Sequence, residues 1–217
     1  VHEYEKNGWI RRVGRGAYVR AGDVFVWKGG LNAVQNQLGL PVHIADKTAL
    51  QLQGYAHFLP LGTGGILSLS AQSGTRLPIW FKQYDWGMRI RYTTANLFSS
   101  NTDIGLTHKS TGSFPIKLSA PERAIMELLY LVPDRESFEE AGLLMEGLAT
   151  LRPDLVQSLL EQCASVKVKR LFLYLSEQSG HPWLEEINNA RVNMGRGKRV
   201  IYKGGRLDAK YGITVPT

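Results

Sequence analysis

Apolar side chains between residues 119 and 180 recur with the period of an α-helix. The i, i+3, i+4, i+7 spacing that places one face against a core is followed by Ile125, Leu128, Leu129 and Val132. Ser119 with Glu122 and Ser137 with Glu140 form predicted capping pairs at the starts of the first and second helices, and Pro133 ends the first. Pro153 begins the third helix, and a fourth runs through Val168–Leu175 and ends at Gly180. The pattern predicts a layer of four helices.

Between residues 60 and 118 the pattern changes to short runs typical of strands. Glycine, proline and asparagine separate the runs Ile66–Ser70, Ile79–Lys82, Met88–Tyr92 and Phe114–Leu118. This section is predicted to form a sheet. Before it, Asp46 is a predicted N-cap of a short helix that Gly54 ends.

The first 39 residues predict a helix end, a hairpin and a second short helix. Asn7-Gly8 stops the first helix, and two apolar runs then flank Gly14-Arg15-Gly16. We expect both glycines to supply the positive φ angles of a tight turn, which leaves Arg15 exposed at the tip. An apolar set between Asp23 and Leu38 predicts the second helix, ending at Gly39.

These elements together predict an α+β protein with two domains. The first covers residues 1–39. The second covers residues 40–217 and comprises a strand-rich part over 60–118, a helical part over 119–188 and a basic, strand-rich tail over 189–217.

Composition places this chain among globular proteins. It has 217 residues, of which 43% are hydrophobic and 21% charged, so extended disorder is excluded. The chain has one cysteine, Cys163, which excludes an internal disulfide and favours a reducing compartment. Because its neighbours are Leu159, Leu160 and Val166, we predict that Cys163 is a small buried side chain. No apolar run approaches the roughly 20 residues that span a bilayer, so we expect a soluble, cytoplasmic protein without a membrane partner.

Glycine-rich segments do not carry a nucleotide-binding motif. Around Gly197-Lys198 a P-loop would need glycine at Val192 and a hydroxyl at Arg199. Gly14-Arg15-Gly16 has Val19 where a dinucleotide fingerprint has its third glycine. We therefore expect no nucleotide cofactor.

The ionisable residues give no catalytic or metal-binding constellation. No two of the five histidines lie three to five residues apart, as a helical metal pair requires. His181 reads as a turn residue whose ring satisfies a backbone group. Adjacent acids such as Glu139 and Glu140 point to different helix faces, so no paired-carboxylate site is indicated. We expect no metal, no cofactor and no enzymatic activity.

Charge is distributed in separate regions, and the net charge is +7. Acidic residues are in excess between 115 and 165, whereas both ends are basic. The predicted hairpin carries Arg11, Arg12, Arg15 and Arg20, with Trp9 and Tyr18 between them. The glycine-rich end carries Arg191, Arg196, Lys198, Arg199, Lys203, Arg206 and Lys210. Such groups suit contacts to nucleic-acid phosphates, although solubilising surface charge gives the same pattern.

The run Gly8–Tyr18, which contains the predicted hairpin, resembles the wing of AbiEi-type antitoxins. The resemblance continues in order through the segments Leu118–Ala124, Leu144–Leu148, Ser165–Leu173 and Gly197–Asp208, and so covers nearly the whole chain. None of these segments is a catalytic signature.

This resemblance implies a bacterial antitoxin that is also the transcriptional autoregulator of a type IV toxin–antitoxin system, used in abortive phage infection. Its functional partner would be a nucleotidyltransferase toxin, without a stable complex. An N-terminal winged helix would bind inverted repeats in its own promoter, with Arg11, Arg12 and Arg15 as wing contacts. Residues 1–39 would then be a truncated winged-helix unit, in which residues 1–7 are the tail of the recognition helix.

Three mechanisms of toxin neutralisation remain open at this point. The basic C-terminal patch would bind the RNA or nucleotide on which the toxin acts. Alternatively, the acidic segment 115–165 would bind a basic surface of the toxin as a direct inhibitor. A catalytic antitoxin or nuclease would need clustered acids in a cleft, and the sequence shows no such cluster.

Overall fold

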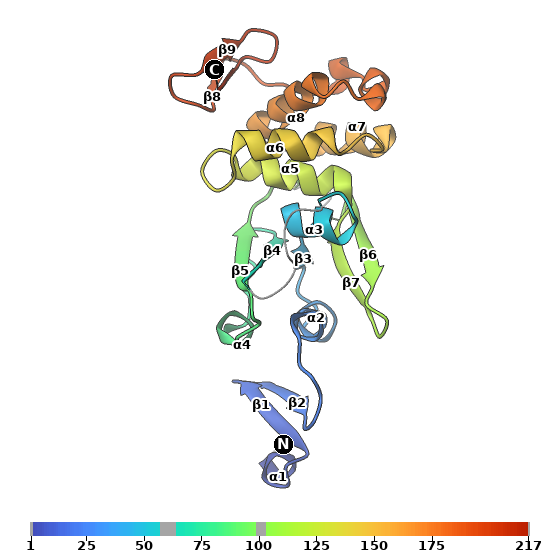
Figure 1. Ribbon diagram of the computed structural model, residues 1–217, viewed down its shortest axis with the longest axis vertical. Helices are drawn as coiled ribbons and strands as arrows, with labels where there is room; N and C mark the ends of the chain where they lie inside the picture. Colours follow the sequence, from blue (N-terminus) through green and yellow to red (C-terminus); the bar gives the residue numbers. More distant parts are fainter. Residues whose placement is uncertain (1, 57–63, 99–102, 217) are drawn as a thin grey trace.

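The computed structural model describes residues 2–56, 64–98 and 103–216, and it shows an elongated α+β protein. Figure 1 shows the layers in chain order: an N-terminal hairpin at one end, a sheet in the middle, a helical layer above it and the C-terminal tail at the other end. The predicted fold class is confirmed.

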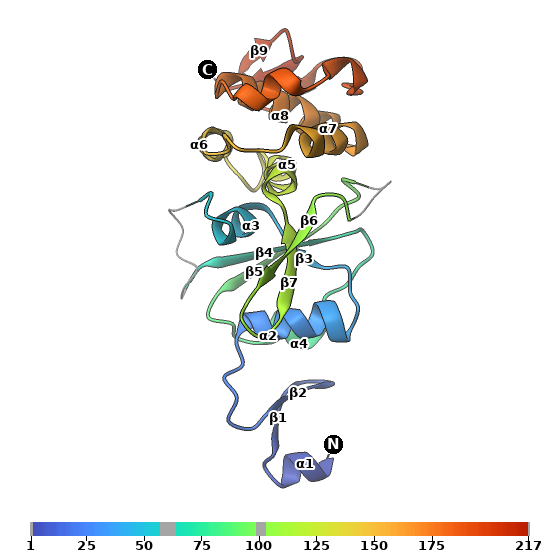
Figure 2. The same cartoon turned by 90° about the vertical axis from the view of Figure 1, so that its right-hand side faces the viewer.

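The helical layer consists of α5 (Pro121–Leu131), α6 (Phe138–Glu146), α7 (Pro153–Gln162) and α8 (Val166–Gln178). Helix α5 lies between the sheet and the other three helices, and it is buried along most of its length (Figure 2). The four predicted helices are thus confirmed, as is the cap at Ser137, whose side chain accepts a hydrogen bond from the Glu140 N–H.

The predicted capping box at the start of α5 is wrong. Ala120 occupies the N-cap position. The Ser119 hydroxyl instead donates to Glu127 over 2.7 Å, and Glu122 accepts hydrogen bonds from Arg152. Both side chains are buried, and each bonds to a partner outside the first turn of the helix, so neither caps it.

The central sheet has five strands in the order β5-β4-β3-β7-β6. Their bounds are β3 (His43–Ile44), β4 (Ile66–Ala71), β5 (Arg89–Thr94), β6 (Leu106–Ser110) and β7 (Pro115–Ser119). Strands β4 and β5 are parallel, as are β3 and β7, whereas β3 pairs antiparallel with β4 and β6 with β7. Helices α3 (Asp46–Leu52) and α5 lie on one side of this sheet, and α2 (Trp27–Asn32) and α4 (Ile79–Gln83) lie on the other (Figure 2).

Two local predictions in this region are wrong. Residues Ile79–Lys82, predicted as a strand, belong to helix α4, in which Trp80 and Phe81 are buried beside Trp86. A short apolar run fits a buried helix as well as a strand, and here the aromatic packing decides. Asp46 is not an N-cap, because Ala45 takes that position and the Asp46 carboxylate binds Arg91.

The N-terminal hairpin follows helix α1 (His2–Lys6) and comprises β1 (Ile10–Gly14) and β2 (Ala17–Arg20). Only Gly16 has the positive φ predicted for both turn glycines, at 76°. Gly14 is required for a different reason, because a Cβ there would lie 2.5 Å from the Cβ of Trp80 in α4. This close approach places the tip of the hairpin against the sheet domain.

Helix α2 continues into one π-helical turn, Ala33–Gln37, and packs with the sheet domain. The Gln35 side chain bonds to the backbone of Val42 and of Lys117. Gly30 lies against the Trp86 ring so closely that a Cβ would come within 2.3 Å of it. The proposed domain boundary after residue 39 remains a prediction.

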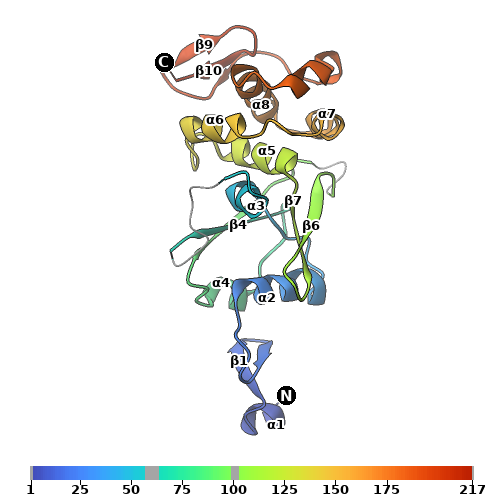
Figure 3. The ribbon, with the colours of Figure 1, turned by 45° about the vertical axis from the view of Figure 1, so that its right-hand side comes forward.

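A 3-10 turn, Pro182–Glu186, follows α8, and a second one, Asn189–Arg191, begins the C-terminal tail. It then forms a small sheet in the order β8-β10-β9, made of β8 (Arg199–Val200), β9 (Arg206–Asp208) and β10 (Ile213–Val215). This sheet lies beside α8, at the far end of the molecule from the hairpin (Figure 3).

Candidate nucleic-acid interface

The four hairpin arginines are all exposed, but they do not share one face. In the β1–β2 register Arg12 is opposite Tyr18 and Ile10 is opposite Arg20, so Arg12, Tyr18 and Arg20 lie on one face. Arg11 is opposite Val19 on the other face, and Arg15 lies in the turn. The predicted exposure of Arg15 at the tip is confirmed, and the structure divides the four arginines between two faces and a tip.

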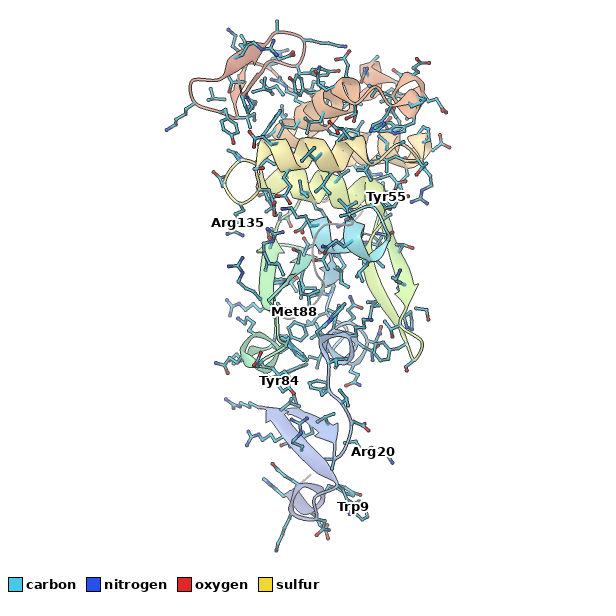
Figure 4. All side chains as sticks on the ribbon, in the orientation of Figure 1. Trp9, Arg20, Tyr55, Tyr84, Met88 and Arg135 are labelled. Atoms are coloured by element: carbon cyan, nitrogen blue, oxygen red, sulfur yellow. The ribbon has the colours of Figure 1, made fainter. Side chains whose placement is uncertain are left out.

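Aromatic side chains extend the hairpin surface toward α1. The Trp9 ring is 62% exposed and lies 5.7 Å from the Tyr4 ring, which is also exposed. Trp9 and Arg20 are both located at the end of the hairpin next to α1 (Figure 4). None of residues 2–29 is fully buried, although Ala17, Phe25 and Trp27 pack against the core.

The seven basic residues of the tail fall into two groups. Arg191 forms an ion pair with Glu161 at 2.8 Å, and Lys210 pairs with Glu177. The hydrogen bond from Lys210 lowers the pKa of Glu177 and raises that of Lys210. The others are exposed and form no ion pair within the described chain: Arg196, Lys198, Arg199, Lys203 and Arg206.

Arg170 of α8 holds the tail in place and was not singled out from the sequence. Its guanidinium donates hydrogen bonds to the backbone carbonyls of Met194, Gly195, Gly197 and Gly212, over 2.6 to 3.4 Å. Burial lowers its pKa, and the charge of Arg199 lowers it further. In the sequence, the basic run Lys167–Arg170 is typical of a solvated helix face, so it does not indicate that Arg170 binds the tail.

Three of the nine acidic residues of segment 115–165 are buried, namely Glu122, Glu127 and Glu136. Glu127 is buried and accepts hydrogen bonds from Arg123 and Ser119 at 2.7 Å, and it lies 2.8 Å from His43. Burial alone would raise the pKa of Glu127, but His43 and Arg123 outweigh that effect and lower it to about 2.

A second buried cluster surrounds Arg91 on strand β5. Its guanidinium lies 3.0 Å from Asp46 and also pairs with Glu136, which Lys47 contacts as well. Burial raises the pKa of Asp46 by more than the Arg91 charge and the Ser68 hydroxyl lower it. With Glu122 bound to Arg152 and Glu140 to Lys47, this acidic segment neutralises cations of its own chain.

Two protein-family descriptions match this chain. Residues 65–216 match the family described as transcriptional regulator, AbiEi antitoxin, type IV toxin–antitoxin system, and residues 1–61 match the AbiEi antitoxin N-terminal domain. The chain belongs to the AbiEi antitoxin family. It is therefore assigned to a family of transcriptional regulators and antitoxins, as the resemblance in its sequence implied.

A solved structure shares the fold of this AbiEi-family chain. The crystal structure of the RV2827C protein from Mycobacterium tuberculosis matches with a TM-score of 0.67 and 14% sequence identity, over 98% of this chain and 77% of that one. Among curated proteins, no sequence matches.

Other candidate chemistry in this AbiEi-family protein has structural explanations. The Cys163 thiol is buried, which raises its pKa to about 11 and makes it a poor nucleophile. The His181 ring bonds to the Met145 carbonyl over 2.6 Å, as predicted. Within residues 2–56, 64–98 and 103–216 we find no metal-binding group of acids, histidines or cysteine, and no helix there is long and apolar enough to cross a bilayer.

Proposed function

We propose that this AbiEi-family protein binds operator DNA, at inverted repeats in its own promoter, through the hairpin β1–β2. The observation that supports this most directly is the exposure of Arg11, Arg12, Arg15 and Arg20 without an ion pair among the described residues. Unpaired arginines release counterions when they bind phosphates, and this release supplies most of the sequence-independent affinity. Bound in this way, the protein represses its operon.

We expect the arginines to make different kinds of DNA contact. Arg12 and Arg20 lie on one face of the ribbon with Tyr18 between them and suit consecutive phosphates. Arg15 at the tip suits insertion into a minor groove. The contact of Gly14 with Trp80 holds the ribbon in a fixed orientation to the sheet domain.

The test is the salt dependence of operator binding by the full-length protein. Replacing Arg11 and Arg15 by alanine is expected to weaken binding to all DNA sequences and to reduce the slope of log K against log salt by about 2. The matched control is Arg76→Ala with Arg89→Ala, which removes the same charge from outside the hairpin. An unchanged slope in the hairpin variant excludes this role for the arginines.

We further propose that the basic tail neutralises a nucleotidyltransferase toxin by binding the RNA or nucleotide on which that toxin acts. The support for this is a set of five cations that form no ion pair in the described structure: Arg196, Lys198, Arg199, Lys203 and Arg206. The other two basic residues of the tail, Arg191 and Lys210, pair with Glu161 and Glu177. A direct inhibitor with an acidic face is less well supported, because Glu122, Glu127, Glu136 and Glu140 bind cations of this chain.

The experiment is co-expression with the toxin, scored by growth. Lys198→Ala with Arg199→Ala is expected to impair rescue while the protein stays folded, whereas Arg191→Ala, which removes a paired charge, is expected to preserve rescue. Full rescue by the double variant removes this surface from the mechanism. Co-purification of the two proteins at physiological salt would instead favour direct inhibition.

A further inference from the structure

A polar groove opens at the carboxyl end of strand β5, where the end of helix α5 passes over the sheet. Its volume is about 430 Å³, and its lining includes Thr93, Tyr130, Asp134, Arg135 and Lys167. Strands β4 and β5 are parallel, so both end on this side of the sheet. Ligands of open sheets commonly bind in the crevice beyond the carboxyl ends of parallel strands.

A small cavity of about 30 Å³ lies deeper and shares Thr93, Tyr130 and Leu131 with the groove. The hydroxyl of Thr93 is shielded from solvent and has no hydrogen-bond partner in the described part of the chain. Buried hydroxyls are normally paired, because desolvation without a partner is costly. The cavity has room for one water-sized polar group next to this hydroxyl.

An aromatic ring and two basic side chains lie at the mouth of the groove. The Tyr130 ring is 38% exposed, and the Lys167 ammonium lies 5.5 Å from its centroid. Lys167 donates to the carbonyls of Tyr130 and Val132, which fixes its position beside the ring. Arg135 is exposed, without an ion pair in the described structure, and lies beside the end of β5 (Figure 4).

An exposed aromatic ring flanked by cations suits a base and its phosphate. Single-stranded nucleic acids are held by stacking on aromatic rings and by basic side chains along the backbone. Asp134, which also lines the groove, can accept a hydrogen bond from a sugar hydroxyl or an exocyclic amine. The volume of the groove lies in the range typical of small-molecule sites.

We propose that this groove binds a nucleotide, with the base on Tyr130, the phosphate at Arg135 and Lys167, and a hydroxyl or amino group directed toward Thr93. None of the hairpin or tail arginines lines the groove. The inference therefore goes beyond the proposed function and does not depend on it.

The test titrates the full chain with nucleoside 5′-monophosphates, the matching nucleosides and inorganic phosphate, measured by calorimetry. Arg135→Ala is expected to weaken nucleotide binding about tenfold and to leave nucleoside binding unchanged, since only the phosphate contact is lost. Arg89→Ala, at the opposite end of β5, is the matched control and is expected to bind as the unmodified protein does.

Thr93→Val separates binding from folding. The hydroxyl has no partner to lose, so the unfolding temperature is expected to stay the same or rise. Nucleotides and nucleosides are both expected to bind more weakly. Unchanged affinity in Thr93→Val and Arg135→Ala alike, absence of binding at millimolar nucleotide, or equal affinity for inorganic phosphate would each overturn the proposal.

Free nucleotides and the terminal nucleotide of an RNA share this chemistry. A short single-stranded RNA that binds more tightly than the monophosphate, and loses that affinity in Arg135→Ala, identifies the strand end as the ligand. An RNA that does not compete with the monophosphate identifies the free nucleotide. Operator binding by Arg135→Ala is expected to keep its salt slope, so failure here and failure of the proposed function give different results.

Discussion

The middle of the molecule and its two ends use charged residues in opposite ways. In the sheet and helical layers, Glu127 and Glu136 are buried, Glu127 pairs with Arg123 of the same helix, and Glu136 pairs with Lys47 and Arg91 from distant elements. On the hairpin and on β8 and β9, most of the arginines and lysines are exposed and unpaired in the described structure. The net charge of a segment therefore does not give the charge of its surface.

This contrast matters for choosing among partners. The acidic excess of residues 115–165 suggests an acidic face when the sequence is read alone, but the folded chain uses part of it to neutralise Lys47, Arg91 and Arg123. The basic excess at the ends is not neutralised in this way. The surface is consequently more basic at its ends than the average charge per residue indicates.

The largest effect is expected from breaking the inner cluster. Glu127→Ala leaves His43 and Arg123 buried without their carboxylate, so the free energy of unfolding should fall by about 3–5 kcal/mol, measured by urea denaturation. Glu139→Ala, an exposed acid on α6, is the control and should change it by less than about 0.5 kcal/mol. Equal losses of unfolding free energy in the two variants would contradict the difference between buried, paired acids and exposed acids.

Acid titration should reveal the same cluster. The pKa of Glu127 is about 2 in the folded protein, against an ordinary value of 4.5 for a glutamate side chain. Its contribution is present above pH 4.5 and is lost as the pH falls toward 2, a loss of about 3 kcal/mol. The raised pKa of Asp46 acts in the opposite direction, because its protonation on acidification favours the folded state, and it acts above the ordinary value of 3.8.

Glu127→Gln is the variant that isolates this pH dependence. Urea midpoints between pH 5 and pH 2 should fall less steeply in the variant than in the unmodified protein. A pH profile of the same slope in both proteins would show that other carboxylates cause the acid loss.

A smaller effect is expected at the base of the tail. Arg170→Ala leaves the carbonyls of Gly197 and Gly212 without their charged donor, and should lower stability by about 2 kcal/mol. Hydrogen exchange should accelerate over residues 195–212 first. Arg196→Ala removes an exposed arginine of the same region and should leave exchange unchanged; if it matches Arg170→Ala, the tail is not held by Arg170.

The hairpin offers a comparison between two glycines. Gly14→Ala brings a Cβ against Trp80 and should cost about 1–3 kcal/mol by forcing the hairpin away from α4, which side-chain NMR signals of Trp80 would report. Gly16→Ala strains a residue with φ of 76° and should cost about 1 kcal/mol without moving those signals. Identical spectra of the two variants would contradict the contact.

The smallest effect is expected from single outer charges. Arg12→Ala and Arg206→Ala should each change the free energy of unfolding by less than about 0.5 kcal/mol, because both side chains are exposed. Thermal unfolding is a sufficient measurement. A loss comparable to that of Arg170→Ala would mean that the ends are part of the folded core.

Local signals predicted the hairpin, most strands and all four helices of the upper layer, because each depends on residues close together in sequence. Strand β6 was missed because Leu106–Ser110 has mostly exposed polar residues and no alternation. Helix α4 was mistaken for a strand because five residues are too few to reveal a period.

The candidate interface was predictable in composition but not in arrangement. The exposure of Arg15 follows from its place in a turn, whereas the pairing of Arg191 and Lys210 depends on acids of α7 and α8 that only the folded chain brings near. Arg170 was missed for the same reason, since its carbonyl partners lie 24 to 42 residues away in sequence.

The elongated arrangement, with the hairpin and the tail at opposite ends of the stacked layers, bears on how the proposed activities share a single molecule (Figure 1). Two ligands at such a separation do not exclude each other sterically. Under the proposed function, copies occupying the promoter keep their tails accessible, so repression does not deplete the pool that opposes the toxin.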